Sequence, residues 1–255
     1  MTKLSVNVNK LATLRNARGK NNPDVAQWAV DIEAMGVHGI TVHPRPDERH
    51  IRFIDVVEIA KRVRGEFNIE GYPDDAWLTL VEKIVPDQAT MVPDPPDAIT
   101  SNAGFNVSKS AELLRASVQR LAALKKLRPT GATTGVRISV FIDPYDFSEA
   151  DASLLAEIGV HRIELYTEKF AENFDQPAGH DITAVYRKAA ELAKSAGLGV
   201  NAGHDLTAAN LHALVRAIPW IDEVSIGHAL ICDALKFGMS ATIRTYLDAL
   251  KPVHG

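Results

Sequence analysis

The length, composition and charge of the chain exclude several classes of protein. Its 255 residues are 46% hydrophobic and 24% charged, which fits one globular domain, because α/β barrels of this size are often undivided. The net charge of −4 gives no overall basic field. No general attraction to nucleic acid or to an anionic membrane is therefore expected, although a local anion site stays possible.

The start of the chain and its cysteine content indicate a cytoplasmic protein. No stretch reaches the roughly 18–20 apolar residues of a membrane span, and the first nine residues lack the apolar core of a secretory signal. The single cysteine, Cys232, cannot form an intrachain disulfide. We interpret it as a small core residue, because no basic cluster beside it would make it reactive.

Short apolar runs alternate with longer stretches of helical periodicity along the whole chain. The predicted strands are residues 4–8, 39–43, 67–70, 88–92, 136–142, 161–166, 198–202 and 223–226. The predicted helices include 25–35, 55–64, 74–84, 109–127, 149–158, 182–196 and 208–217. Eight strands predict a (β/α)8 TIM barrel as a single domain over residues 1–255. An open doubly wound sheet is the alternative, but no G-x-G-x-x-G turn follows the first strand.

Three irregular segments interrupt this pattern. Residues 93–108 and 167–181 follow predicted strands, so both are expected at the C-terminal face of the barrel, and the first could act as a lid. Residues 128–135 precede a strand and are interpreted as a surface loop of the opposite face.

Alternation along the strands predicts a polar barrel interior. The side chains expected to point inward are Asn7, Thr41, Asn68, Ser139, Glu164, Asn201 and Ser225. Barrel interiors are usually filled by Val, Ile and Leu. The Ser and Thr hydroxyls are interpreted as a structural hydrogen-bond network, whereas a buried ionised Glu164 would need a partner and is interpreted as functional.

The C-terminal ends of the strands carry the candidate chemistry. His43, Glu70, Glu164 and His204 suit general acid–base catalysis, because histidine titrates near neutral pH and a partly buried glutamate can be tuned toward it. A structural, hydrogen-bonded role is the alternative for each histidine taken alone. Other polar groups at these ends are Asn7, Asn9, Asn201 and His228.

Two glycine-containing loops predict a phosphate site. The loops at 201–205 and 226–229 follow the seventh and eighth strands, where barrels commonly bind phosphate. Arg18 and Arg45 could bind a second anionic group by parallel hydrogen bonds. For Arg15 and Arg18 a solvated helix face is the alternative. No metal site is expected, because the histidines are not paired as His-x-His and no acidic cluster accompanies them.

Residues 6–19, 39–50, 68–70, 201–204 and 225–229 together resemble the pyridoxine 5′-phosphate synthase family. The likeness runs through nearly the whole chain. It implies a (β/α)8 barrel that condenses 3-amino-2-oxopropyl phosphate with 1-deoxy-D-xylulose 5-phosphate, giving pyridoxine 5′-phosphate, phosphate and water without a cofactor. It also implies a homo-octamer built from dimers.

The resemblance assigns roles to individual residues. It implies that His43 and Glu70 accept protons, that His204 donates a proton, and that Glu164 stabilises cationic intermediates. The amino-ketone phosphate would be held by Asn7, Arg18, Asp205, Gly227 and His228. The deoxyxylulose phosphate would be held by Arg45, His50 and Thr100.

The sequence departs from the family pattern in two places. Asn9 and Lys10 stand where the family usually has an Asp-His pair, and Asp205 replaces the glycine that usually follows the donor histidine. Lys10 could still bind an anionic substrate as a point charge, whereas Asp205 brings a negative charge near a phosphate site.

Two other functions are compatible with the same barrel. One is a phosphosugar isomerase or aldolase, although a Schiff-base aldolase needs a lysine that points inward from a strand and the predicted strands offer none. The other is a non-catalytic barrel that binds a phosphometabolite.

Overall fold

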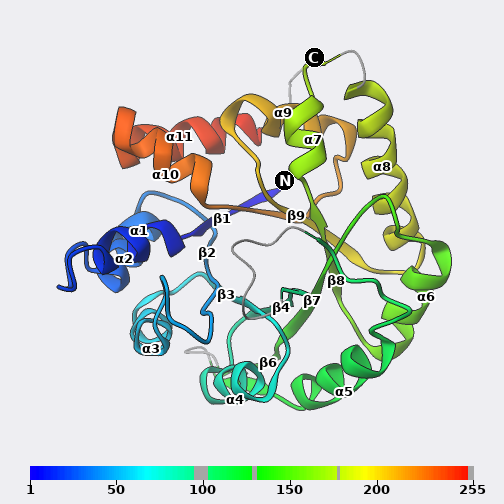
Figure 1. Ribbon diagram of the computed structural model, residues 1–255, viewed down its shortest axis with the longest axis horizontal. Helices are drawn as coiled ribbons and strands as arrows, with labels where there is room; N and C mark the ends of the chain where they lie inside the picture. The colour runs from blue at the N-terminus through cyan, green and yellow to red at the C-terminus, as the bar shows by residue number, and fades with distance from the viewer. Residues whose placement is uncertain (95–102, 128–130, 177–178, 252–255) are drawn as a thin grey trace.

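Eight parallel strands close into a barrel in the computed structural model, which describes residues 1–94, 103–127, 131–176 and 179–251 (Figure 1). Around the barrel the order is β1, β2, β3, β4, β7, β8, β9 and β10, and β10 pairs with β1. The strands are β1 (Lys3–Asn7), β2 (Gly39–Val42), β3 (Glu66–Gly71), β4 (Gln88–Met91), β7 (Arg137–Ile142), β8 (Arg162–Tyr166), β9 (Gly199–His204) and β10 (Glu223–Ile226). The predicted TIM barrel and its eight strands are therefore confirmed.

Helices surround the barrel and cover the apolar outer face of its strands (Figure 1). They are α1 (Asn9–Asn16), α2 (Val25–Ala34), α3 (Phe53–Arg62), α4 (Asp75–Ile84), α5 (Ala111–Ala122), α6 (Glu149–Ile158), α7 (Glu168–Asn173), α8 (Gly179–Ser195), α9 (Ala208–Ala217), α10 (His228–Phe237) and α11 (Met239–Ala249). Side-chain caps fix several starts, since Asp24, Asp74, Ser148 and Thr207 each accept a hydrogen bond from a backbone N–H of the first turn. Within the described ranges no helix is both long and apolar enough to cross a membrane.

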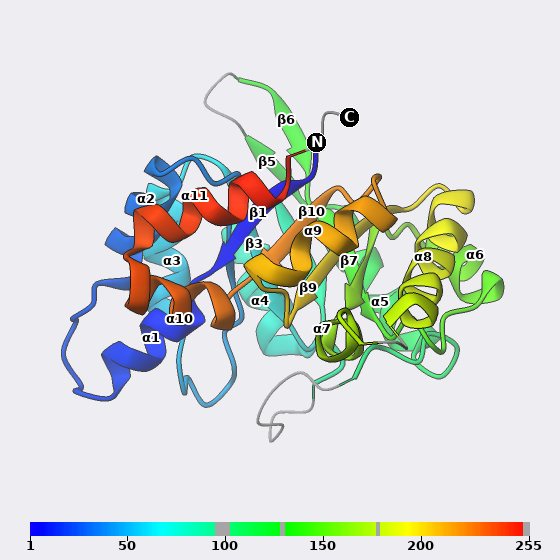
Figure 2. The same ribbon diagram turned by 90° about the horizontal axis from the view of Figure 1, so that it is seen from above.

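A short hairpin replaces the end of one predicted helix and part of one predicted loop. β5 (Lys125–Leu127) pairs antiparallel with β6 (Thr133–Gly135), so the prediction of a helix to residue 127 and a loop over 128–135 was wrong at these positions. Leu127 had extended the apolar periodicity, but it is 73% exposed and does not pack on the core. The hairpin projects from the end of the barrel where the N-terminus lies (Figure 2).

Two further expectations are corrected by the structure. Helix α7 occupies residues 168–173, within a segment predicted to be irregular, and its buried Phe170 packs on Tyr186 of α8. Cys232 lies on the exposed side of α10, with Sγ 3.7 Å from Nε2 of His228 one helical turn earlier. It is therefore a surface residue, because the apolar face of α10 is supplied by Leu230 and Ile231 instead.

The middle of the barrel interior is filled by hydrogen-bonded polar groups. All the side chains predicted to point inward are buried except Asn7, which is partly buried at the cavity described below. Oγ of Ser5 and Oγ1 of Thr41 share a hydrogen bond of 2.7 Å. Thr90 Oγ1 donates to Asn68 Oδ1 at 3.0 Å. The structural network predicted for the hydroxyl groups is thus confirmed for Thr41. Oγ of Ser139 has no hydrogen-bond partner among the described residues, and Oγ of Ser225 donates to Glu70 at the cavity.

The N-terminal end of the interior is charged and largely paired. Nη1 of Arg137 lies 2.6 Å from Oε1 of Glu66 and also donates to Gln88 Oε1 at 3.3 Å. Nη1 of Arg162 donates to Asn201 Oδ1 at 3.1 Å. These contacts link the five strands β3, β4, β7, β8 and β9 and satisfy charges that would be costly to bury alone.

Glu223 is the exception at this end of the barrel. The residue is 1% exposed, and burial together with the neighbouring Glu66 raises its pKa to about 8, against the attraction of Arg162 and Arg137. The carboxyl group is therefore protonated in the folded protein at a pH where it is ionised in the unfolded chain.

This difference predicts a pH dependence of stability. Between the ordinary glutamate pKa of 4.5 and about 8, the folded state binds more protons at Glu223 than the unfolded state, so the free energy of unfolding falls as the pH rises. The Glu223→Gln variant carries no titrating group at this position. Between pH 5 and pH 9 its free energy of unfolding should therefore fall less than that of the wild type. Urea denaturation at both values measures this, with Glu149→Gln on the exposed start of α6 as the control. Equal slopes in wild type and Glu223→Gln would contradict it.

Candidate active site

A cavity of about 390 Å³ lies at the C-terminal end of the barrel strands. The predicted site residues that line it are Asn7, Asn9, Lys10, His43, Arg45, His50, Glu70, Glu164, His204, Asp205, Gly227 and His228. Val92, Phe141, Glu168 and Ser225 complete the lining. Groups as far apart in sequence as Asn7 and His228 therefore meet in one space.

Two predicted site residues are not placed in this cavity. Arg18 follows α1, is exposed and does not line the cavity. Thr100 lies outside the described residues, as does the central part of the segment 93–108 that was predicted to act as a lid. Within the described part of the chain, no three or more His, Cys, Asp or Glu residues are grouped so as to hold a metal ion.

His43 and Glu70 form the centre of the site. His43 directly follows strand β2, and Glu70 lies near the end of the neighbouring strand β3. His43 Nδ1 lies 3.6 Å from Glu70 Oε2. Asn7 Nδ2 donates to Oε2 of Glu70, and Ser225 Oγ donates to Oε1, each at 3.4 Å. The two acid–base groups are thus close enough that protonation of one changes the electrostatic environment of the other.

Asn9 fixes the backbone that carries His43. Its Oδ1 accepts a hydrogen bond of 3.0 Å from the N–H of His43, and its own N–H donates to Asn7 Oδ1 at 3.0 Å. The first residues after β1 and β2 are therefore bridged by one side chain. An amide oxygen supplies this bridge, so the departure from the family at position 9 leaves the acceptor in place.

Glu164 lies beneath these groups and is 2% exposed. Burial, followed by the charges of Glu70 and Glu223, raises the pKa of Glu164 well above its ordinary value. Its Oε2 has no hydrogen-bond partner among the described residues. A side chain at position 203 would collide with Oε1 of Glu164, so Gly203 is required on the neighbouring strand.

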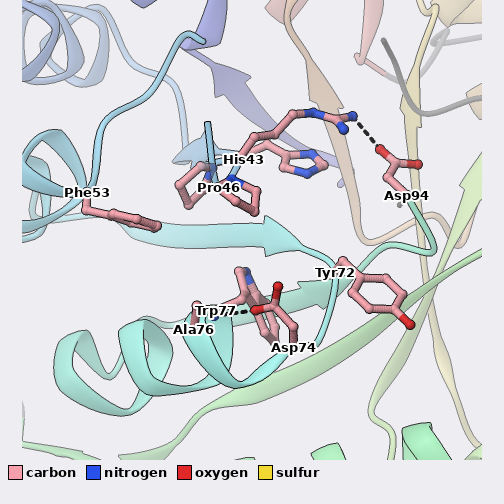
Figure 3. A pocket seen from close by; sticks show the side chains of 10 residues that line it. His43, Pro46, Phe53, Tyr72, Asp74, Ala76, Trp77 and Asp94 are labelled. Atoms are coloured by element: carbon pink, nitrogen blue, oxygen red, sulfur yellow. Dashed lines mark hydrogen bonds and ion pairs between the residues drawn. The ribbon is translucent and has the colours of Figure 1, made fainter. Parts of the chain in front are cut away.

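One wall of the cavity is cationic, and its arginine is already paired. Nη2 of Arg45 lies 2.7 Å from Oδ2 of Asp94, and both side chains are buried. Figure 3 shows this pair at the edge of a second hollow that shares His43 and Arg45 with the cavity and is otherwise lined by residues such as Phe53, Tyr72 and Trp77. Asp94 therefore fixes the direction of the guanidinium group.

His50 is neutral despite its place in the cationic wall. Burial, followed by the charges of His43 and Arg45, lowers the pKa of His50 to about 3. Its Nδ1 accepts a hydrogen bond of 2.9 Å from the N–H of Ile51, so the proton of the neutral ring is on Nε2. His50 therefore offers a neutral N–H donor to an anionic ligand.

Arg15 supports the segment that carries His50. It is 1% exposed, its Nη1 lies 2.5 Å from Asp55 Oδ1, and its Nη2 donates to the carbonyl of His50 at 3.1 Å. The solvated helix face considered for Arg15 was wrong, because the ion pair with α3 draws the guanidinium inward.

The start of α10 lies beside Asn7 at the cavity. Gly227 precedes the helix and His228 is its first residue. A Cβ at position 227 would lie 3.1 Å from Cβ of Asn7, so glycine allows the close approach of two backbones here. The unpaired N–H groups of a helix start favour an anion, as the sequence predicted for this loop.

His204 and its neighbours form the opposite, acidic wall. His204 Nδ1 lies 2.6 Å from Asp205 Oδ2, and the ring of Tyr166 packs edge-on against His204. Tyr166 OH donates to Glu168 Oε2 at 2.5 Å. Sequence reasoning missed Glu168, although its position directly after a predicted strand and Thr167 was a usable signal.

Comparisons with known proteins show which family the chain belongs to. The family described as pyridoxal phosphate biosynthesis protein PdxJ matches residues 4–252. A pyridoxine 5′-phosphate synthase of Cytophaga hutchinsonii is 51% identical over 251 residues, which are 98% of this chain and 100% of that protein. The protein of the same name from Parabacteroides distasonis is 51% identical over 250 residues, covering 98% of this chain and 99% of the relative.

Solved structures with low sequence identity show the fold alone. Phosphoribosyl anthranilate isomerase from Thermococcus kodakaraensis has a TM-score of 0.59 at 12% identity, with both chains covered completely. A mutant tryptophan synthase alpha-subunit from Pyrococcus furiosus has a TM-score of 0.59 at 11% identity, covering 98% of this chain and 99% of the other. The family model covers nearly the whole chain, and both relatives named above are 51% identical to it. The chain therefore belongs to the PdxJ family of pyridoxal phosphate biosynthesis proteins.

Proposed function

We propose that this chain condenses 3-amino-2-oxopropyl phosphate with 1-deoxy-D-xylulose 5-phosphate, forming pyridoxine 5′-phosphate, phosphate and water. The observation that carries the proposal is the convergence of His43, Glu70, Glu164 and His204 on one cavity between a cationic wall and a helix start. The reaction joins an amine to a ketone and then closes a ring, so it needs several proton transfers and sites for two phosphate groups.

His43 and Glu70 act in this proposal as the proton acceptors. The imine forms between the two substrates, so the enzyme supplies bases and acids and needs no Schiff-base lysine of its own. The contact of 3.6 Å between His43 Nδ1 and Glu70 Oε2 supports a shared role, because a proton taken up by one group can be stabilised by the charge of the other.

Glu164 stabilises the cationic intermediates, and His204 donates a proton. Burial and the nearby carboxylates raise the pKa of Glu164, which favours its neutral form. A positive charge on a substrate intermediate would favour its ionised form. The carboxylate would then stabilise that intermediate at the moment when it forms.

The two phosphate groups would bind on different sides of the cavity. The amino-ketone phosphate would be held by the start of α10, through Gly227 and His228, with Asn7 and the backbone N–H of Asp205. Arg18 would have to move toward the cavity to take part, since it is exposed and outside the lining.

The deoxyxylulose phosphate would be held on the cationic wall. We assign it to Arg45, His50 and Thr100, with Asn9 and Lys10 nearby. The Arg45 guanidinium is oriented by Asp94, and His50 would donate from Nε2. A planar guanidinium and a neutral N–H donor together bind a phosphate directionally.

We also propose a homo-octamer built from dimers, in the cytoplasm, with residues 1–255 forming one barrel domain. Exposed apolar side chains support association through helices, because Leu14 of α1 is 54% exposed and Leu235 and Phe237 of α10 are 78% and 59% exposed. Neighbouring helices α1 and α10 would thus present apolar side chains to a second copy.

The first prediction concerns the reaction itself. Chelator-treated protein given both substrates should release inorganic phosphate and form a pyridine chromophore, measured by a phosphate assay and by absorbance. Omitting either substrate should abolish both signals. Absence of both products from the complete mixture would show that the proposed function is wrong.

A trapping control separates this reaction from a Schiff-base aldolase. Lys10 is the lysine among the described cavity-lining residues. Borohydride added with substrate should leave no stable adduct on the protein by mass spectrometry. An adduct that disappears in Lys10→Gln would favour the aldolase instead.

The second prediction concerns the two bases. His43→Asn and Glu70→Gln should each lower kcat by about 10²–10⁴-fold, the usual weight of a general acid or base. Steady-state kinetics measures the effect, and Glu149→Gln on α6 serves as the control. Near-normal turnover in both variants would show that the pair takes no part in the mechanism. If the wild type shows no turnover and the variants lose only affinity for the substrates, a binding protein would be favoured.

A further inference from the structure

The side chain of Asp205 contacts the candidate proton donor directly. Its Oδ2 lies 2.6 Å from Nδ1 of His204, within the range of a charge-assisted hydrogen bond. The hydrogen bond with His204 lowers the pKa of the Asp205 carboxyl, so this group is ionised at neutral pH. The family resemblance places a glycine here, which has no side chain to make this contact.

The backbone around this pair is held by contacts on both sides. His204 has a φ of +97°, in the left-handed region that side chains other than glycine rarely adopt, and such strain persists only where the surroundings impose it. Thr167 Oγ1 donates to the carbonyl of Gly203 at 2.7 Å. Asn210, which is 1% exposed in the first turn of α9, donates from Nδ2 to the carbonyl of Asp205 at 3.4 Å.

The ring of His204 is also fixed by Tyr166. Their ring centroids lie 5.2 Å apart, with an interplanar angle of 81°. Tyr166 OH in turn donates to Glu168 Oε2 at 2.5 Å, which restrains the tyrosine. The imidazole therefore has one edge on a carboxylate and an aromatic ring packed against it.

We propose that the Asp205 side chain is a positioning residue that orients His204 through Nδ1 and stabilises its protonated form, so that Nε2 gives the proton to the substrate. This inference rests on the proposed function for the identity of the substrates. Hydrogen bonding at one ring nitrogen fixes which nitrogen exchanges protons, as in the histidine–carboxylate pairs of other enzymes.

The contact between His204 and Asp205 also explains how a negative charge at position 205 can lie near the predicted phosphate site. A free carboxylate would repel the phosphate held by the start of α10. Here the Asp205 charge is directed at His204, and His228 at the start of α10 contributes a further favourable charge. The titratable and charged groups that line this cavity together with His204 and Asp205 are Lys10 of α1, His43, Arg45 and His50 after β2, Glu70 of β3, Glu164 of β8, Glu168 of α7 and His228 of α10, with Tyr166 against the ring.

Asp205→Asn tests the proposal in the whole protein. We expect kcat to fall by about 10- to 100-fold, the weight of one charge-assisted hydrogen bond, while KM for each substrate changes by less than about twofold. Asp205→Glu should restore part of the loss. The matched control is Asp146→Asn, which removes an exposed carboxylate that does not line the cavity.

The pH profile gives a readout that a merely structural role would not move. A proton donor is active in its protonated form, so activity is lost on the alkaline side as the donor deprotonates. Removing a stabilising carboxylate makes deprotonation easier. The alkaline limb of kcat/KM should therefore move to lower pH in Asp205→Asn and stay in place in Asp146→Asn.

Histidine NMR tests the pairing independently of turnover. The Cε1–H signal of His204, assigned by its loss in His204→Gln, should titrate at lower pH in Asp205→Asn than in wild type. An unchanged titration and an unchanged kcat in a folded Asp205→Asn would overturn this inference while leaving the proposed function intact. A raised KM for one substrate with normal kcat would overturn it in favour of direct substrate binding. An inactive wild type with the expected NMR shift would overturn only the proposed reaction.

Discussion

Burial of carboxylates along the barrel axis is the constraint on which the rest of this structure depends. An ionised carboxylate inside a protein needs a cation or several donors, and otherwise takes up a proton. Both solutions occur here. Glu66 is paired with Arg137 at the N-terminal end, whereas burial raises the pKa values of Glu223 and Glu164. The barrel interior therefore contains two kinds of carboxyl group. One is paired with an arginine, and the other has a raised pKa and can change its charge.

The candidate active site lies at the C-terminal ends of the strands, above this polar interior. Several β/α units bring polar side chains to the C-terminal rim, and neighbouring strands place them within reach of each other, as His43 and Glu70 show. Short side chains then fix the backbone between strands. Asn9 performs this task between β1 and β2, and Asn210 performs it at the start of α9. The candidate acid–base groups are thus supported by hydrogen bonds from neighbouring side chains.

The sequence predicted the barrel well because strand alternation and helix periodicity repeat eight times. It also predicted the inward polar residues, since a strand has only two faces. It was incomplete where tertiary contacts override local pattern. A solvated face remained an alternative for Arg15, which pairs with Asp55 of α3. The helix predicted to reach residue 127 ends earlier, and Leu127 lies in an exposed hairpin. Asp205 was noticed as a departure, but its contact with His204 depends on a φ of +97° that no sequence pattern encodes.

The cavity balances its charges by neutralising one member of each set. Among the cationic groups, burial and like charges lower the pKa of His50 to about 3. Among the carboxylates, burial and like charges raise the pKa of Glu164. Two charged groups of the cavity have a close partner, because Arg45 pairs with Asp94 and Asp205 pairs with His204. A charge that appears in the cavity during the reaction would change the protonation of His50 and Glu164 in particular, because burial disfavours their charged forms until a compensating charge is present.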